Sequence, residues 1–334
     1  MMHGRRRVAA KEPTQDEKDE ARQQLERYCA LNSRVMGLKA QNVFTTDALD
    51  ATRQLLELNT ELHTVWNYRR TIMKKLDAWE DTEKRQSMLE QELGFLMKVI
   101  RNNIKSYWMW NHRMWALSQL PQPTWRGELS LVDKLIGMDA RNYHAWDYRR
   151  FVIARLKDTE DGDAVDEQEF AFTTAQINRD CANHSAWHNR SKLLPAILAR
   201  ADQPRREKVL QTENELIQNA IYTDPEDQNA WLYYDWLLDI QQSDEDRIKL
   251  LRGKIAAIRE LLELEEDGTR PLIELVSRFA ELGRLQPGSV SDAEKEECMK
   301  TLCTLKGVDS YHAGRYTDIS SALSKRWKVH DLCV

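Results

Sequence analysis

Apolar residues recur at helical spacing from about residue 25 onward, beginning with Leu25, Tyr28 and Leu31. Stretches with this spacing alternate with short polar turns, which predicts helices of roughly 12–20 residues joined by tight connections. The turn at Asp224-Pro225 is typical, because a proline cannot continue the preceding helix. The pattern therefore predicts an all-α protein.

Five tryptophans divide this pattern at intervals of 44, 36, 41 and 44 residues. They are Trp66, Trp110, Trp146, Trp187 and Trp231. An Asn or Asp lies seven residues before each one, and three residues after it lies an Arg in four cases and Tyr234 in the fifth. A repeat of this length indicates stacked helical hairpins that bury their apolar faces against their neighbours. We expect the tryptophans in the core, and each arginine paired with a carboxylate or carbonyl of an adjacent hairpin.

The repeat continues in degraded form toward the C-terminus. Leu275 lies 44 residues after Trp231, and Tyr316 lies 41 residues after that. We predict a mobile N-terminal tail over residues 1–19 and a single helical-repeat domain over residues 20–334, with degenerate repeats near Leu275 and Tyr316.

Composition excludes several classes of protein. Glycine (12 residues) and proline (8) are scarce in the 334-residue chain, which favours helices. No apolar stretch is long enough for a transmembrane segment or a signal peptide. The net charge of −5 argues against nucleic-acid binding. The five scattered cysteines are expected to be reduced thiols of a cytoplasmic protein.

Function must come from positions where the repeats differ. The turn before the second tryptophan supplies Lys105 and Tyr107, and the turn before the third supplies Arg141, Tyr143 and His144. Equivalent positions of neighbouring units lie side by side, so these groups should meet on one rim. Such a rim suits a phosphate-bearing ligand, although solvated charges are also common on surfaces.

Other candidate sites are weak. His184 and His188 stand four residues apart, but no third metal ligand is evident near them. Glycine-rich phosphate loops and hydrolase motifs are absent from the sequence.

The frame around each tryptophan resembles the repeat of protein prenyltransferase α-subunits. Longer strings are similar to the α-subunits of Rab (type II) geranylgeranyltransferases over nearly the whole chain. They include MHGR at 2–5, ELGFL at 92–96, KSYWMWNHR at 105–113, LPQPTWRGEL at 120–129, DARNYHAWDYRRFV at 139–152 and QNAIYTDPEDQNAW at 218–231.

This resemblance implies a right-handed superhelix (solenoid) of antiparallel helical hairpins that forms an obligate heterodimer with a β-subunit. The β-subunit would hold zinc and most of the isoprenoid pocket. The implied reaction transfers geranylgeranyl from geranylgeranyl diphosphate to C-terminal cysteines of Rab GTPases presented by an escort protein. A need for magnesium stays open.

The resemblance also implies residue roles. Lys105 matches the family's diphosphate-facing lysine, Tyr107 matches the nearby tyrosine, and Tyr143 with His144 matches the third-repeat pair at the subunit boundary. His3 matches an N-terminal histidine that can reach the zinc of the partner.

Two departures bear on the subfamily. The α-subunit shared by farnesyltransferase and the type I enzyme usually has Gln where this chain has Trp108, so a clamp for a terminal carboxylate is missing. No segment after Trp231 has room for the immunoglobulin-like or leucine-rich-repeat domains of larger relatives, so we expect the compact form. The alternatives are that shared α-subunit and a non-catalytic helical-repeat scaffold.

Overall fold

A computed structural model describes residues 14–101, 103–240, 243–264 and 268–328. These ranges contain fifteen α-helices and two short 3-10 helices, and they contain no strand, so the all-α prediction is confirmed. None of the described helices is both long and apolar enough to cross a membrane. The chain forms two compact units, residues 1–162 and 163–334.

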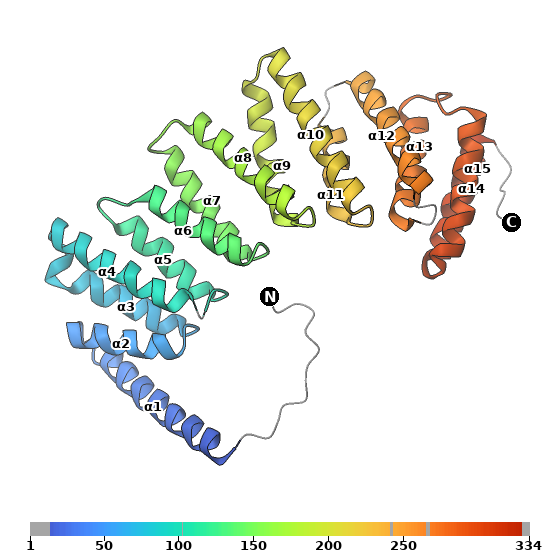
Figure 1. The fold of residues 1–334 in the computed structure, drawn as a ribbon. Coiled ribbons are helices and arrows are strands. Elements are labelled where there is room, and N and C mark those ends of the chain that lie inside the picture. The colour runs from blue at the N-terminus through green and yellow to red at the C-terminus, as the bar shows by residue number, and fades with distance from the viewer. Residues whose placement is uncertain (1–13, 102, 241–242, 265–267, 329–334) are drawn as a thin grey trace. The chain divides into compact units, whose positions relative to one another are not determined.

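Unit 1 contains the first seven α-helices (Figure 1). They are α1 (Gln15–Ala40), α2 (Thr46–Leu58), α3 (His63–Lys75), α4 (Thr82–Ile100), α5 (Tyr107–Gln119), α6 (Trp125–Met138) and α7 (Tyr143–Lys157), and the 3-10 helix η1 (Asp77–Trp79) lies between α3 and α4. Successive helices pack as the hairpins α2/α3, α4/α5 and α6/α7, and the tryptophan-bearing helix α5 also contacts α3 and α7.

Unit 2 begins at the start of α8 and contains the remaining helices (Figure 1). They are α8 (Gly162–Arg179), α9 (His184–Arg200), α10 (Gln203–Thr223), α11 (Gln228–Asp239), α12 (Asp244–Leu264), α13 (Thr269–Leu285), α14 (Asp292–Val308), η2 (Ser310–His312) and α15 (Ala313–Trp327). Here α9 packs against α11, while α10/α11, α12/α13 and α14/α15 form hairpins.

The repeat tryptophans are core residues, as predicted. All five side chains are between 1% and 3% exposed. Each indole N–H donates to the main-chain carbonyl six residues earlier, at 2.7–2.9 Å. Because a buried indole N–H needs a partner, this bond fixes the turn that leads into each tryptophan helix.

The repeat arginines join neighbouring hairpins through buried carboxylates. Arg69 on α3 binds Glu92 on α4 with N–O distances of 2.5 and 2.7 Å. Arg113 binds Glu128 and Arg190 binds Glu213 in the same way, which confirms the expected pairing for these three. Arg149 also binds a carboxylate, that of Asp133 in its own hairpin.

Each of these three glutamates also binds the side chain that lies two residues after the next repeat tryptophan along the chain. His112 donates to Glu92 at 2.7 Å, Tyr233 donates to Glu213 at 2.6 Å, and Tyr148 donates to Glu128. All three glutamates lie 18 residues before that tryptophan. Two partners per carboxylate satisfy charges that would otherwise be costly to bury.

The fifth repeat, which has Tyr234 in place of arginine, receives a cation from another helix. Lys254 on α12 is 1% exposed, lies 4.1 Å from the Tyr234 ring centroid and binds Asp235 at 2.8 Å. Burial and the nearby charge of Arg278 lower the pKa of Lys254 to about 8, although Asp235 and Glu274 act in the opposite direction.

The degenerate repeat positions are occupied by buried side chains. Leu275 and Tyr316 are each 2% exposed, and Tyr316 donates to Asp309 at 2.5 Å. A single domain over residues 20–334 stays a prediction.

Two other expectations need adjustment. Helix α1 begins at Gln15, inside the segment expected to be a tail, because Thr14 and Glu17 form a capping box there. Cys29, Cys181 and Cys298 are free thiols, but Cys303 is disulfide-bonded, so the expectation of reduced thiols is wrong for Cys303.

Candidate functional site

The main chain at Lys105 is held by the two repeats that flank it. The carbonyl of Ile104 accepts hydrogen bonds from the Trp110 indole at 2.8 Å and from the Asn142 amide at 3.5 Å. The next residue is Lys105, whose side chain is exposed and has no ion-pair partner within the described ranges. The ammonium group therefore stands free on a fixed segment of backbone.

Three predicted site residues form one cluster beside Lys105. The Tyr143 hydroxyl donates to the Tyr107 hydroxyl at 2.5 Å. The ring centroid of His144 lies 4.3 Å from Tyr107, edge to face, and 4.4 Å from Tyr143. Tyr107 and Tyr143 are the first residues of α5 and α7, so the contact between these two helices brings the cluster together.

The surroundings of His144 and Tyr143 favour the uncharged form of each side chain. Partial burial lowers the pKa of His144, although Asp147, Glu61 and a hydrogen bond to the Lys105 main chain act to raise it. The hydrogen bond to Tyr107 raises the pKa of Tyr143 to about 12. Because its pKa is lowered, the His144 imidazole adds no positive charge to this rim near neutral pH.

The start of α5 has an additional property that our reading of the sequence missed. Asn142 caps α7 by accepting from the His144 and Ala145 amides, whereas Ser106, at the equivalent position of α5, forms no side-chain cap. The Ser106 hydroxyl is buried and lacks a hydrogen-bond partner among the described residues. The sequence carries no signal for the missing cap, because Ser is as common an N-cap residue as Asn.

Together these features suit an oxyanion. The unsatisfied amides of a helix N-terminus carry partial positive charge, and here they lie next to an exposed ammonium and a phenol. A phosphate or diphosphate group could accept hydrogen bonds from all three.

The structure does not bring every candidate residue into the cluster. Arg141 is exposed, and no side-chain contact joins it to the three rings within the described ranges. His184 and His188 lie on α9, and the described residues hold no group of three or more His, Cys, Asp or Glu side chains suited to a metal. His3 lies outside the described residues.

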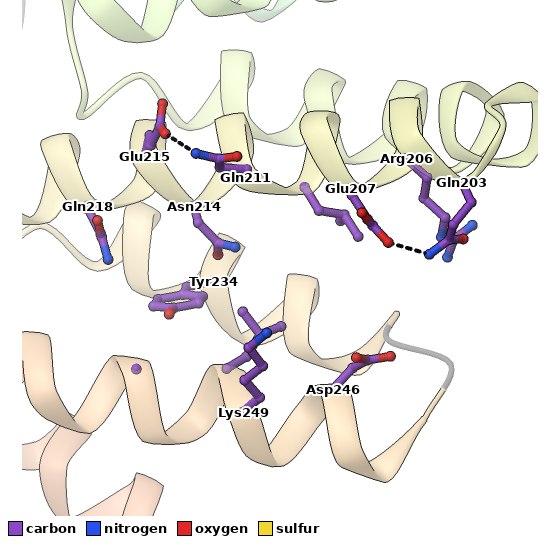
Figure 2. A pocket seen from close by; sticks show the side chains of 13 residues that line it. Gln203, Arg206, Glu207, Gln211, Asn214, Glu215, Gln218, Tyr234, Asp246 and Lys249 are labelled. Atoms are coloured by element: carbon purple, nitrogen blue, oxygen red, sulfur yellow. Dashed lines mark hydrogen bonds between the residues drawn. The ribbon is translucent and has the colours of Figure 1, made fainter.

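A groove of about 690 Å³ lies in unit 2 among α10, α11 and α12 (Figure 2). Two pairs of its polar side chains bind each other, with Gln203 donating to Glu207 at 2.8 Å and Gln211 to Glu215 at 3.0 Å. The lining also contains the cations Arg206 and Lys249 and the buried phenol of Tyr234, but it contains no imidazole.

Comparison with known proteins identifies the same helical repeat. The model of the protein prenyltransferase alpha subunit repeat matches residues 45–76, 89–120, 125–156, 166–197 and 210–241. A solved structure of Candida albicans protein geranylgeranyltransferase-I complexed with GGPP superposes with a TM-score of 0.67 at 20% identity, covering 89% of this chain and 91% of that one. That likeness bears on the fold alone.

Three curated relatives bear the name geranylgeranyl transferase type-2 subunit alpha. The Bos taurus protein is 40% identical over 242 residues, which are 71% of this chain and 42% of the relative. The Saccharomyces cerevisiae protein is 34% identical over 71% of this chain and 72% of its own length. The Candida albicans protein is 32% identical over 80% of this chain and 83% of its own length. The chain thus spans less than half of the mammalian relative.

The repeats and their buried tryptophans are those of a protein prenyltransferase α subunit. Within that class, the chain belongs to the family of geranylgeranyl transferase type-2 α subunits.

Proposed function

We propose that this chain is the α subunit of a heterodimeric geranylgeranyltransferase that modifies C-terminal cysteines of Rab GTPases presented by an escort protein. The observation that carries the proposal is the free Lys105 ammonium beside the Tyr107–Tyr143–His144 cluster and the uncapped start of α5. The enzyme would work in the cytoplasm, where these acceptor proteins are made.

In the proposed reaction a cysteine sulfur forms a bond to C1 of the geranylgeranyl group. The C1–O bond breaks, and its electron pair leaves with the diphosphate. Negative charge grows on the leaving oxygens, so a cation placed there stabilises the transition state more than the ground state. We assign that task to Lys105, with Tyr107 donating a hydrogen bond to the same group.

The other cluster residues position these two. Tyr143 donates to Tyr107, which leaves the Tyr107 proton available for the ligand. His144 packs against the Tyr107 ring and bonds the Lys105 main chain. Zinc held by the partner subunit would lower the pKa of the acceptor thiol.

Lys105→Ala tests the assignment directly. We expect the variant to form the heterodimer and to transfer geranylgeranyl about 10²–10³ times more slowly in a single turnover, because a preorganised charge donor is lost. Lys98→Ala, which removes an exposed lysine of α4, serves as the matched control and should transfer at the wild-type rate. An unchanged rate in Lys105→Ala would sink the assignment.

The choice of partner tests the subfamily. Co-expression with a type II β-subunit should yield a stable 1:1 complex that transfers geranylgeranyl to an acceptor–escort complex. Productive pairing with a β-subunit that reads C-terminal tetrapeptides would instead assign the chain to the shared α subunit, and pairing with neither would favour a scaffold.

We further propose that His3 reaches the zinc of the β-subunit, on the resemblance of MHGR alone. His3→Ala should then weaken zinc retention by the heterodimer in a chelator competition. Equal retention in the variant and the wild type would exclude zinc contact.

A further inference from the structure

Cys303 on α14 is the one cysteine of the described residues that forms a disulfide bond. The chain has five cysteines, of which Cys29, Cys181 and Cys298 are free thiols. The remaining one, Cys333, lies outside the described residues. Because a disulfide bond needs a second cysteine, elimination leaves Cys333 as the partner of Cys303.

The neighbouring cysteine of α14 cannot take that place. Cys298 and Cys303 belong to one continuous helix, and their spacing along it puts the two Cα atoms about 8.7 Å apart. A disulfide bond requires a Cα–Cα distance below about 7 Å. Burial raises the pKa of the Cys298 thiol to about 12, and its side chain is 0% exposed. Cys298 therefore does not form the thiolate that would attack the bond of Cys303.

The end of α15 packs against the helices that precede it. Trp327, the last residue of α15, lies against Gly283 of α13, where a Cβ atom would come within 3.0 Å of the indole nitrogen. The next residue, Lys328, has a φ of 57°, the left-handed conformation that ends a helix and redirects the chain. The five residues from there to Cys333 span up to about 17 Å when extended. Because α14 packs against both α13 and α15, this reach permits a bond to Cys303.

The bond is accessible to small thiols and closes a loop over the end of the fold. Cys303 is half-buried, in contrast to the fully buried Cys298. Disulfides of cytoplasmic proteins are usually transient, because the glutathione pool reduces those that it can reach. The loop contains η2 and α15, the last elements of the described chain. A terminal repeat has a neighbour on one side only, so its helices open first.

We infer that Cys303 and Cys333 form a redox-sensitive clasp, which locks α15 onto α14 when the chain is oxidised and releases it when the chain is reduced. The inference rests on the proposed function only for the compartment in which the chain works. It gives the terminal hairpin a role in regulation that geranylgeranyl transfer itself does not require.

The closing step is thiol–disulfide exchange with a small disulfide such as oxidised glutathione. One protein thiolate attacks a glutathione sulfur, and the other half of the reagent leaves and takes up a proton. The second protein thiolate then attacks the protein sulfur of this mixed disulfide and releases the second glutathione. The protein loses two electrons and two protons, and two molecules of reduced glutathione are formed. Excess reduced glutathione reverses both steps.

Alkylation followed by mass spectrometry tests the pairing. After treatment with oxidised glutathione and denaturation, the full-length wild-type chain should present three alkylatable thiols, and five after reduction. Cys333→Ser should present four thiols with or without reduction, because Cys303 then has no partner. Cys29→Ser, at an exposed cysteine of α1, is the control and should present two thiols before reduction and four after it. A peptide that links Cys303 to any other cysteine, or five thiols in the unreduced wild type, would overturn the pairing.

Hydrogen exchange of the native chain tests the clasp. The backbone amides of α15 should exchange about tenfold more slowly in excess oxidised glutathione than in excess reduced glutathione. Cys333→Ser should exchange at the faster rate in both buffers, and Cys29→Ser should behave as the wild type. Equal exchange of the wild type in the two buffers, or a bond that survives excess reduced glutathione, would overturn the redox role. Neither measurement needs transfer activity, so failure of the clasp is distinguishable from failure of the proposed function.

Discussion

Lys105 owes its position to bonds made by the residue before it. The Ile104 carbonyl is tied to Trp110 and Asn142, so the lysine side chain is displayed without being held itself. An ammonium with no built-in partner keeps its capacity for an anionic ligand. This arrangement explains how an exposed residue can be placed accurately.

Sequence comparison of the repeats could find Lys105 and its neighbours because they break the pattern of an otherwise regular frame. It could not find the contact geometry. The hydrogen bond from Tyr143 to Tyr107 and the missing cap at Ser106 depend on how the starts of α5 and α7 meet. Nothing in the local sequence of either helix encodes that meeting.

Lys254 makes stability depend on pH. Its folded-state pKa of about 8 lies below the usual value near 10.4 for an unfolded chain, so between these pH values the unfolded state binds more protons. The free energy of unfolding should therefore rise with pH in this window, by up to roughly 3 kcal/mol. Arg278 also binds Asp235, so Lys254→Met still leaves that carboxylate a partner.

The measurement is the difference in unfolding free energy between the wild type and Lys254→Met, by urea denaturation at several values between pH 8 and pH 10.5. Other groups titrate equally in both proteins and cancel. The difference should change steadily in favour of the wild type as pH rises, and parallel curves would contradict the lowered pKa of Lys254.

At the scale of helices, the buried triads of arginine, glutamate and His or Tyr join one hairpin to the next. Arg69, Glu92 and His112 come from α3, α4 and α5, and two further triads repeat the design. The arginine of each triad was predictable from its fixed place three residues after a repeat tryptophan. The glutamate half was not, because a Glu in a charged helix looks like many others until its distance of 18 residues from the tryptophan is noticed.

Arg190→Met should be strongly destabilising. Glu213 is 0% exposed and, among the described residues, would keep only the Tyr233 hydroxyl as a partner, so we expect a loss of about 3–5 kcal/mol. Urea denaturation followed by circular dichroism measures the loss. Arg259→Met, which breaks the half-exposed pair with Glu297, is the control and should cost about 1 kcal/mol or less.

The double variant Arg190→Met with Glu213→Leu provides the reverse test. Removing both charges should recover much of the stability lost in the single variant. If the single variant is as stable as Arg259→Met, the Arg190 triad contributes little to holding the hairpins together.

For the whole molecule, periodic tryptophans were enough to predict the helical class and the hairpin repeat. Leu275 and Tyr316, which the same spacing predicts as degenerate repeat positions, are buried although neither is a tryptophan; that these positions are repeats stays a prediction. The start of α1 and the disulfide bond of Cys303 were not predicted, because the tryptophan frame carries no information about a capping box or cysteine pairing.

The isolated chain should not catalyse transfer. Under the proposed function the β-subunit holds the zinc and most of the isoprenoid pocket, so this chain would supply only part of the site. We expect no product from the purified chain mixed with zinc, geranylgeranyl diphosphate and an acceptor–escort complex, and full activity once the β-subunit is added. Transfer by the chain alone would show that it carries a complete active site.

The indole bond that closes every turn has a consequence for protein engineering. In each repeat, one residue directly follows the carbonyl that accepts the indole hydrogen bond. These residues have different side chains on equivalent backbone positions: Glu61, Lys105, Arg141, Ala182 and Glu226. Because the indole binds the main chain and does not contact the side chain that follows, the residue at this position can be substituted without redesigning the hydrophobic core. A lysine installed at Ala182 would be a simple trial of grafting an anion-binding group onto a repeat that now lacks one.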